Sequence, residues 1–397
     1  MLSNFFNFLL VSYPLTPKIG IFGIYIYLQE IFIILYITIS VLASKVESRH
    51  ISIVSLAWAL QLYILANYFL TGDPVHLAYF KQLMIFNILL IPSSRLVNIV
   101  STQKLFNLWL IVACANLAYI VLIKITENPG ALTYLFEYSP KYRIIGLTGA
   151  GFDLLSGQLK SSFSGDPIGT TTISLSILLA LGTIHSACYQ KMNKLRVFLF
   201  FVVTLLTMSR SGPLVLIIAI AVAYLLKTNS RRFIARNFRV ITILAVIIVT
   251  ATVSGSLAIN KFDFTNIDTF ITVLVRFEMW KNIFTYVGAN PMTLLFGVGI
   301  YADSVANIVG IDYAESLFFD ALLRYGLLGA GAFVMIFIMM FSMILNSKNN
   351  SPERFALLLF LPGFFVVNWM AGSSLLTDFL LPLILVMLAK GTSPYVR

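Results

Sequence analysis

The sequence predicts an all-α polytopic membrane protein, with about 12 transmembrane helices in one domain that covers residues 1–397. Hydrophobic residues make up 59% of the chain and charged residues 11%, whereas about 25% of an average soluble protein is charged. The mean hydropathy is +0.92. The apolar residues form continuous runs, many of them long enough to cross a bilayer as helices.

Polar breaks separate these apolar runs into candidate spans. They cover residues 21–43, 51–70, 79–99, 104–125, 167–188, 195–208, 213–227, 238–258, 325–345, 355–371 and 375–390. The shorter run 3–15 is expected to cross first, which brings the total to about 12 and places both chain ends inside. Residues 1–16 have no basic start and no small-residue cleavage site, so no cleavable signal peptide is expected.

The net charge of +11 is concentrated in every second loop. Short basic loops face the cytoplasm in membrane proteins, so the charge indicates topology and nucleic acid is not an expected partner. The basic positions include Lys45, Arg49, Arg95, Lys104, Lys191, Lys194, Arg196, Lys348, Arg354 and Lys390. Two of the outward-facing loops are long, residues 126–166 and 259–324, and chemistry on a substrate is expected there.

The two cysteines and three histidines form no metal-ligand or redox pattern. The sequence also contains no glycine-rich phosphate-binding loop. No metal and no cofactor are therefore expected, and the energy for any group transfer must come from the substrate itself.

Arg210 occupies the short turn between the apolar runs 195–208 and 213–227. A charge at membrane depth costs at least ~2.5 kcal/mol, so such a residue indicates function, here the binding of an anion. Ser209 and Ser211 add hydroxyl donors beside the guanidinium. The alternative is an arginine that extends to the lipid head groups.

Arg276 lies in the second long loop, within a segment of helical periodicity. One stripe of this helix contains Val273, Arg276, Trp280, Ile283 and Val287. Glu278 and Lys281 fall largely on the other side, which predicts an amphipathic helix at the outer interface. A charge on the apolar side requires a partner, either a nearby carboxylate or an anionic ligand.

The segment 314–324 is expected to extend the helix of span 325–345 into an outer vestibule. Asp320 and Arg324 are four residues apart and are expected to pair. Glu315 has no such local partner, and in a partly buried cavity it is suited to act as a general base. A solvated loop carboxylate is the alternative.

Arg143 lies in the first long loop, which also contains Lys141 and Lys160. A basic outer loop opposes the usual charge bias and indicates either an anionic ligand or lipid head groups.

Three motifs resemble the O-antigen polymerase and ligase superfamily, bacterial integral-membrane glycosyltransferases of the GT-C type. They are TMSRSGPLVL at 207–216, RFEMWKNIF followed by NPMTLLFGVGIY at 276–301, and AESLFFDALLRYGLLG at 314–329. The resemblance implies a site on the periplasmic face of the bacterial inner membrane, with an undecaprenyl-diphosphate-linked oligosaccharide as substrate. It also implies membrane lipids and a polysaccharide chain-length regulator as partners.

The resemblance further implies roles for single residues. Arg210 and Arg276 match the family arginines thought to bind the diphosphate, and Glu315 stands where the ligase branch usually has histidine. This departure favours an O-antigen polymerase, in which Glu315 accepts the proton of a sugar hydroxyl and the anomeric carbon inverts without a metal. An O-antigen ligase acting on lipid A core, a non-enzymatic flippase or other transporter, and a peptidoglycan-type polymerase remain alternatives. The other expected substrate contacts are Ser209, Ser211, Arg143, Asp320 and Arg324.

Overall fold

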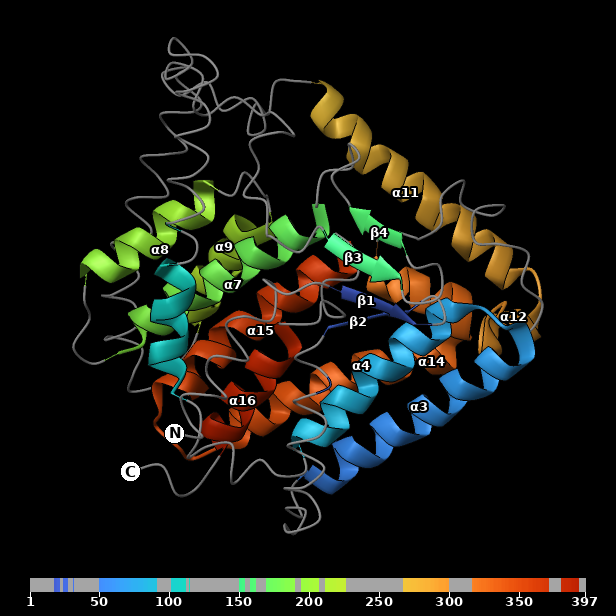
Figure 1. Ribbon diagram of the computed structural model, residues 1–397, viewed down its shortest axis with the longest axis horizontal. Helices are drawn as coiled ribbons and strands as arrows, with labels where there is room; N and C mark the ends of the chain where they lie inside the picture. Colours follow the sequence, from blue (N-terminus) through green and yellow to red (C-terminus); the bar gives the residue numbers. More distant parts are fainter. Residues whose placement is uncertain are drawn as a thin grey trace.

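The computed structural model describes residues 18–21, 24–27, 31, 50–90, 101–111, 114, 150–153, 158–161, 169–189, 194–206, 211–225, 267–299, 316–370 and 380–392. This part of the chain is predominantly helical, as predicted (Figure 1). The helices are α3 (Ile51–Thr71), α4 (Pro74–Leu90), α7 (Gly169–Ala187), α8 (Lys194–Leu206), α9 (Ser211–Leu225), α11 (Ile267–Gly288), α12 (Pro291–Phe296), α14 (Leu317–Asn346), α15 (Pro352–Met370) and α16 (Leu380–Thr392).

Most of the described helices coincide with predicted spans. Helices α3, α7, α8, α9 and α15 match their predicted ranges to within a few residues, while α4 begins earlier than predicted, with Pro74 in its first turn. Residues 102–111 are helical within the predicted span 104–125. The predicted spans 3–15 and 238–258 lie outside the described residues, so the full set of about 12 spans stays a prediction.

Two of the described helices, α3 and α14, are long and apolar enough to cross a membrane. Shorter apolar stretches occur at Ser176–Ala187, Ser211–Leu225 and Leu383–Thr392. These helices are consistent with an integral membrane protein.

A small sheet is the main difference from the all-α prediction. It consists of β1 (Lys18–Ile21), β2 (Ile24–Tyr27), β3 (Ala150–Asp153) and β4 (Gln158–Ser161), in the order β2-β1-β3-β4. Strand β1 pairs antiparallel with β2 and parallel with β3. The helix predicted from residue 21 is therefore wrong for β2, where isoleucine and tyrosine alternate after two glycines and favour strand over helix.

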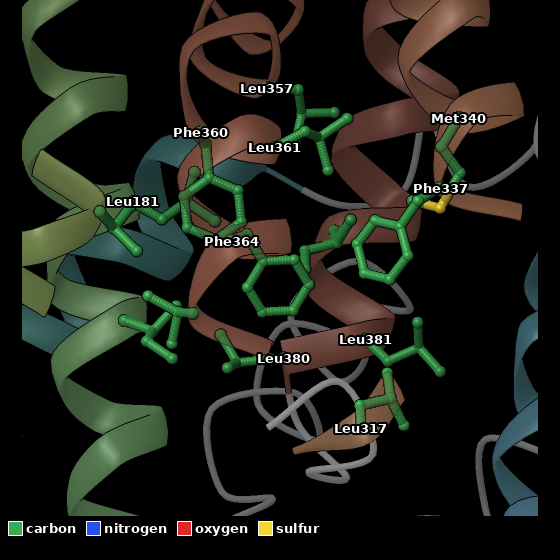
Figure 2. Close-up of a cluster of buried hydrophobic side chains, with 14 of the residues drawn as sticks. Leu181, Leu317, Phe337, Met340, Leu357, Phe360, Leu361, Phe364, Leu380 and Leu381 are labelled. Atoms are coloured by element: carbon green, nitrogen blue, oxygen red, sulfur yellow. The ribbon is translucent and has the colours of Figure 1, made fainter. Parts of the chain in front are cut away.

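One part of the apolar core lies where α14, α15 and α16 meet, and α7 and α9 pack against α15 there (Figures 1 and 2). The Phe360 and Phe364 rings stack with their centroids 5.1 Å apart, and Phe337 of α14 lies 6.0 Å from Phe364. Helices α9 and α15 approach closely at Gly363, where a Cβ would lie 3.0 Å from the Val215 backbone. This packing fixes α14, the helix that carries the third motif.

Polar residues gather at the two ends of α14. Near its C-terminal end, the Arg354 side chain donates to the carbonyls of Ile344, Leu345 and Asn349. Thr102 and His185 contact Glu353 at the same end. All of these lie in or beside loops predicted to be cytoplasmic, whereas residues of predicted outer loops meet at the other end of α14. The structure thus groups the loops as the charge pattern predicts.

Candidate functional site

The first part of α14 is set apart by a kink at Gly326, whose φ is 63° and ψ is −163°. A kink interrupts the helical hydrogen-bond ladder and leaves carbonyls that need other donors. The Val298 N–H donates to the Leu323 carbonyl at 2.8 Å, and the Gly299 N–H donates to the Arg324 carbonyl at 3.2 Å. The loop that follows α12 therefore docks onto the kink through its backbone.

Two glycines permit this contact. A Cβ on Gly326 would lie 2.4 Å from the Leu295 backbone, and a Cβ on Gly297 would lie 2.4 Å from the Arg324 carbonyl carbon. Both glycines have positive φ, a conformation that side chains disfavour. The second and third motifs of the sequence are thus joined where their backbones cross.

Helix α11 packs against the start of α14. The Trp280 ring stacks on Phe319, with centroids 4.8 Å apart and planes inclined by 10°. Met279, Trp280, Ile283 and Val287 are buried, whereas Glu278, Lys281 and Asn282 are exposed. The predicted helix and its buried stripe are confirmed, whereas its place at the outer interface stays a prediction. Arg276, which was predicted to share this stripe, lies one turn before Trp280 and is only partly buried.

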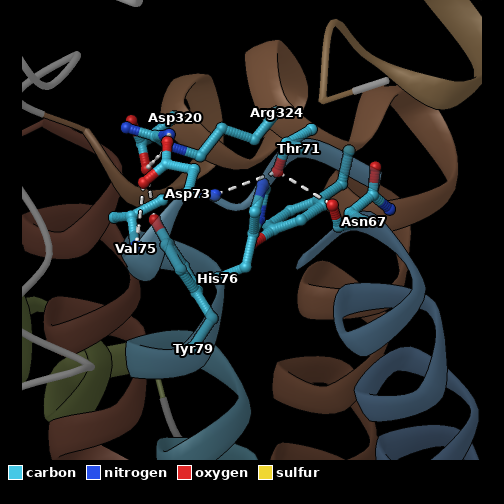
Figure 3. A network of polar contacts seen from close by, with 9 residues as sticks. Asn67, Thr71, Asp73, Val75, His76, Tyr79, Asp320 and Arg324 are labelled. Atoms are coloured by element: carbon cyan, nitrogen blue, oxygen red, sulfur yellow. Dashed lines mark hydrogen bonds and ion pairs between the residues drawn. The ribbon is translucent and has the colours of Figure 1, made fainter. Parts of the chain in front are cut away.

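An outer polar cluster, formed by Asp73, Tyr79, Asp320 and Arg324, joins α14 to the turn between α3 and α4 (Figure 3). Arg324 Nε donates to Asp320 Oδ2 at 3.1 Å, and Arg324 Nη1 donates to Asp73 Oδ2 at 3.2 Å. The Tyr79 hydroxyl donates to the same Asp320 Oδ2. The predicted pair of Asp320 and Arg324 is confirmed, and Asp73 and Tyr79 are members that the sequence analysis missed.

Aromatic residues of the α3–α4 hairpin pack against Tyr325, which directly precedes the kink. Tyr325 is fully buried, and its hydroxyl lies 2.8 Å from His76 Nδ1. The Tyr63 hydroxyl donates to the Phe296 carbonyl at 2.7 Å, at the end of α12. The hairpin, α12 and the start of α14 are thereby held as one unit.

Several predicted site residues lie outside the described part of the chain, namely Glu315, Arg210, Ser209 and Arg143. Their neighbours are described. Glu315 directly precedes Ser316, whose side chain caps α14 by accepting from the Phe319 N–H at 3.4 Å. Ser211, directly after Arg210, begins α9 and is buried. The Gly212 N–H donates to Ser176 Oγ at 3.1 Å, which ties this end of α9 to α7.

The described residues contain no group of three or more histidine, cysteine, aspartate or glutamate side chains that could hold a metal ion. What they provide at this end of α14 is a capped helix start, a docked amphipathic helix that carries an arginine, and a buried ion cluster.

Residues 195–334 match the family model described as O-antigen ligase. All three motifs fall within this range, including the crossing of Gly297 with Gly326. No curated relative matches the chain. The resemblance drawn from the motifs is confirmed over this segment, which is similar to the O-antigen ligase family of membrane glycosyltransferase-like enzymes. The preference for the polymerase branch stays a prediction.

Proposed function

We propose that this protein is an O-antigen polymerase of the bacterial inner membrane. It transfers an oligosaccharide from undecaprenyl diphosphate to a sugar hydroxyl of a second lipid-linked repeat unit, on the periplasmic face. The observation that carries the proposal is the stack of Trp280 on Phe319, because it brings the helix of Arg276 to the helix that starts after Glu315.

In the proposed reaction, the acceptor hydroxyl oxygen attacks the anomeric carbon of the donor glycan while the bond from that carbon to the diphosphate breaks. Undecaprenyl diphosphate leaves, and Arg210 and Arg276 stabilise the negative charge that grows on it. Glu315 accepts the proton of the acceptor hydroxyl. In-line attack inverts the configuration at the anomeric carbon, and no metal takes part. Arg143, Ser209 and Ser211 contribute further contacts to the anionic part of the donor.

The choice of polymerase over ligase depends on Glu315, which stands where the ligase branch usually has histidine. A flippase would require polar residues along a path that connects both membrane faces. In α14, the polar groups of Asp320 and Arg324 lie at one end, and the stretch from Leu327 to Leu345 carries no charged residue.

Reconstitution in proteoliposomes with purified lipid-linked repeat units tests the proposal. A polymerase produces a ladder of longer glycans from these units alone. Products that form only when lipid A core is added would identify a ligase instead. Exchange of the units between leaflets without sugar transfer would identify a flippase.

Two variants test the assigned roles. Glu315→Gln is expected to abolish ladder formation and to leave donor binding unchanged, because the amide cannot accept the proton. Arg276→Gln is expected to weaken donor binding, whereas Lys281→Gln on the exposed side of the same helix serves as the matched control. Wild-type ladders from Glu315→Gln, or equal effects of the two α11 variants, would contradict these roles.

A further inference from the structure

The outer polar cluster carries more negative than positive charge. Arg324 lies between two carboxylates, and its side chain is 8% exposed, while those of Asp320 and Asp73 are 9% and 38% exposed. Charges that lie close together and partly out of water interact more strongly than charges in bulk solvent. A diphosphate placed beside this cluster would therefore be repelled by the uncompensated carboxylate. We therefore do not expect Arg324 to contact the anionic part of the substrate.

The buried carboxylate of Asp320 is only half satisfied. Its Oδ2 accepts hydrogen bonds from Arg324 Nε and from the Tyr79 hydroxyl. Its Oδ1 is buried and receives no hydrogen bond from any described residue. A buried acceptor without a donor destabilises the folded protein, and a charged acceptor does so more strongly. The cluster is thus complete only when a donor from outside it reaches Oδ1.

The place of Asp320 in α14 and the charge of the cluster favour one kind of donor. Asp320 lies one turn after Ser316, the cap of α14, and Glu315 directly precedes that cap. The hydrogen-bond donors of a glycan are its neutral hydroxyl groups, which a net negative cluster attracts and a diphosphate lacks. A sugar hydroxyl bound at Oδ1 would therefore hold the acceptor glycan one helical turn after Ser316, the residue that follows the expected base in the sequence.

We propose that Asp320 Oδ1 is a hydroxyl-binding subsite for the acceptor glycan, and that Asp73 is a positioning residue that holds it in place through Arg324. The subsite deepens the proposed polymerase function and rests on it for the identity of the glycan. It also includes the α3–α4 turn, outside residues 195–334, in the site.

Asp73 can be altered without breaking its turn. Its Oδ1 accepts from the Val75 N–H at 2.9 Å, which supports the start of α4, and its Oδ2 accepts from Arg324. Asparagine keeps an oxygen for the Val75 N–H but removes the charge that faces Arg324. Thr71 provides a matched control in the same turn, because its hydroxyl binds the Asn67 carbonyl and the Asp73 N–H.

The test uses the full-length protein in proteoliposomes and two probes. The acceptor probe is the repeat-unit oligosaccharide released from its lipid carrier and joined to an alkyl chain, so that it has no diphosphate. The donor-site probe is undecaprenyl diphosphate, which has no glycan. KM for the acceptor probe and inhibition by undecaprenyl diphosphate are measured for the wild type and for Asp320→Asn, Asp73→Asn and Thr71→Val.

Asp320→Asn is expected to raise KM for the acceptor probe about tenfold or more, the effect of losing a hydrogen bond to a charged group. Asp73→Asn is expected to raise it less, and Thr71→Val to leave it unchanged, with equal inhibition by undecaprenyl diphosphate in all four proteins. Asp73→Glu, which restores the charge, is expected to recover part of the loss caused by asparagine.

An unchanged KM for the acceptor probe in Asp320→Asn would overturn the subsite. The subsite would also be overturned if inhibition by undecaprenyl diphosphate weakened in this variant as much as KM rises. A rise in Thr71→Val equal to that in Asp73→Asn would overturn the positioning role of Asp73. If the wild type makes no ladder, the proposed function fails. Direct binding of the alkyl glycan to the wild type and to Asp320→Asn still tests the subsite in that case.

Discussion

Replacement of Gly326 by alanine tests whether the kink of α14 depends on the close crossing with Gly297. At Gly326, φ is 63° and ψ is −163°, a region adopted almost only by glycine, which costs other residues about 1–3 kcal/mol. A Cβ there would lie 2.4 Å from the Leu295 backbone, which cannot rotate away as a side chain would. The loop must then move, and the two hydrogen bonds to the carbonyls of Leu323 and Arg324 are lost at about 1 kcal/mol each.

The expected loss in unfolding free energy is therefore about 3–5 kcal/mol. The measurement is a thermal melt of the purified protein in detergent, followed by its tryptophan fluorescence. Gly331→Ala is the control, because a Cβ at Gly331 meets no atom within 4 Å and lies in the same helix. Alanine there is expected to stabilise the helix by about 0.5–1 kcal/mol. A Gly326→Ala protein that melts at or above the wild-type temperature would refute the steric reasoning.

Three further substitutions are expected to change stability in the same melt. Trp280→Ala removes a buried ring and is expected to lower the unfolding free energy by about 3 kcal/mol. Tyr286→Ala, at an exposed position of the same helix, should change it by less than about 0.5 kcal/mol. Equal effects of the two variants would refute the docking of α11. Arg354→Lys loses the planar guanidinium that donates to three carbonyls and is expected to lower the unfolding free energy by about 1–2 kcal/mol. An unchanged stability would show that the positive charge alone is sufficient. Thr102→Val removes the 2.6 Å hydrogen bond to the buried Glu353 carboxylate and is expected to lower the unfolding free energy by about 1–3 kcal/mol. Thr102→Ser keeps the hydroxyl and should melt at the wild-type temperature.

The sequence predicted the features that depend on local periodicity. The amphipathic stripe of α11 was predictable because Trp280, Ile283 and Val287 repeat at helical spacing, and all three are buried. The pair of Asp320 and Arg324 was predictable because residues four apart on a helix face each other. The span of α14 was predictable from its apolar composition, although its kink was not, because a glycine in an apolar helix carries no sign of the backbone that approaches it.

The long-range part of the site could not be predicted in the same way. Asp73 lies 251 positions from Arg324, and Tyr79 lies 241 positions from Asp320. The charge pattern placed residues 71–78 and 314–324 on the same side, but many side chains in those loops satisfy that condition. The pairing of β1 with β3 is a comparable case, since β1 joins residues of the first long loop through backbone hydrogen bonds that leave no pattern in either segment.

In the proposed polymerase, the distribution of charge around the start of α14 distinguishes the donor from the acceptor. Its donor and its acceptor are both lipid-linked repeat units, so shape alone does not decide which one occupies which position. Arg276 and Arg210 provide positive charge where a diphosphate is to be held. At the outer polar cluster, Arg324 is already shared by two carboxylates, so this edge attracts hydroxyl groups and repels the diphosphate. Two units of the same chemistry are thereby oriented in opposite roles, the donor by its diphosphate and the acceptor by its sugar.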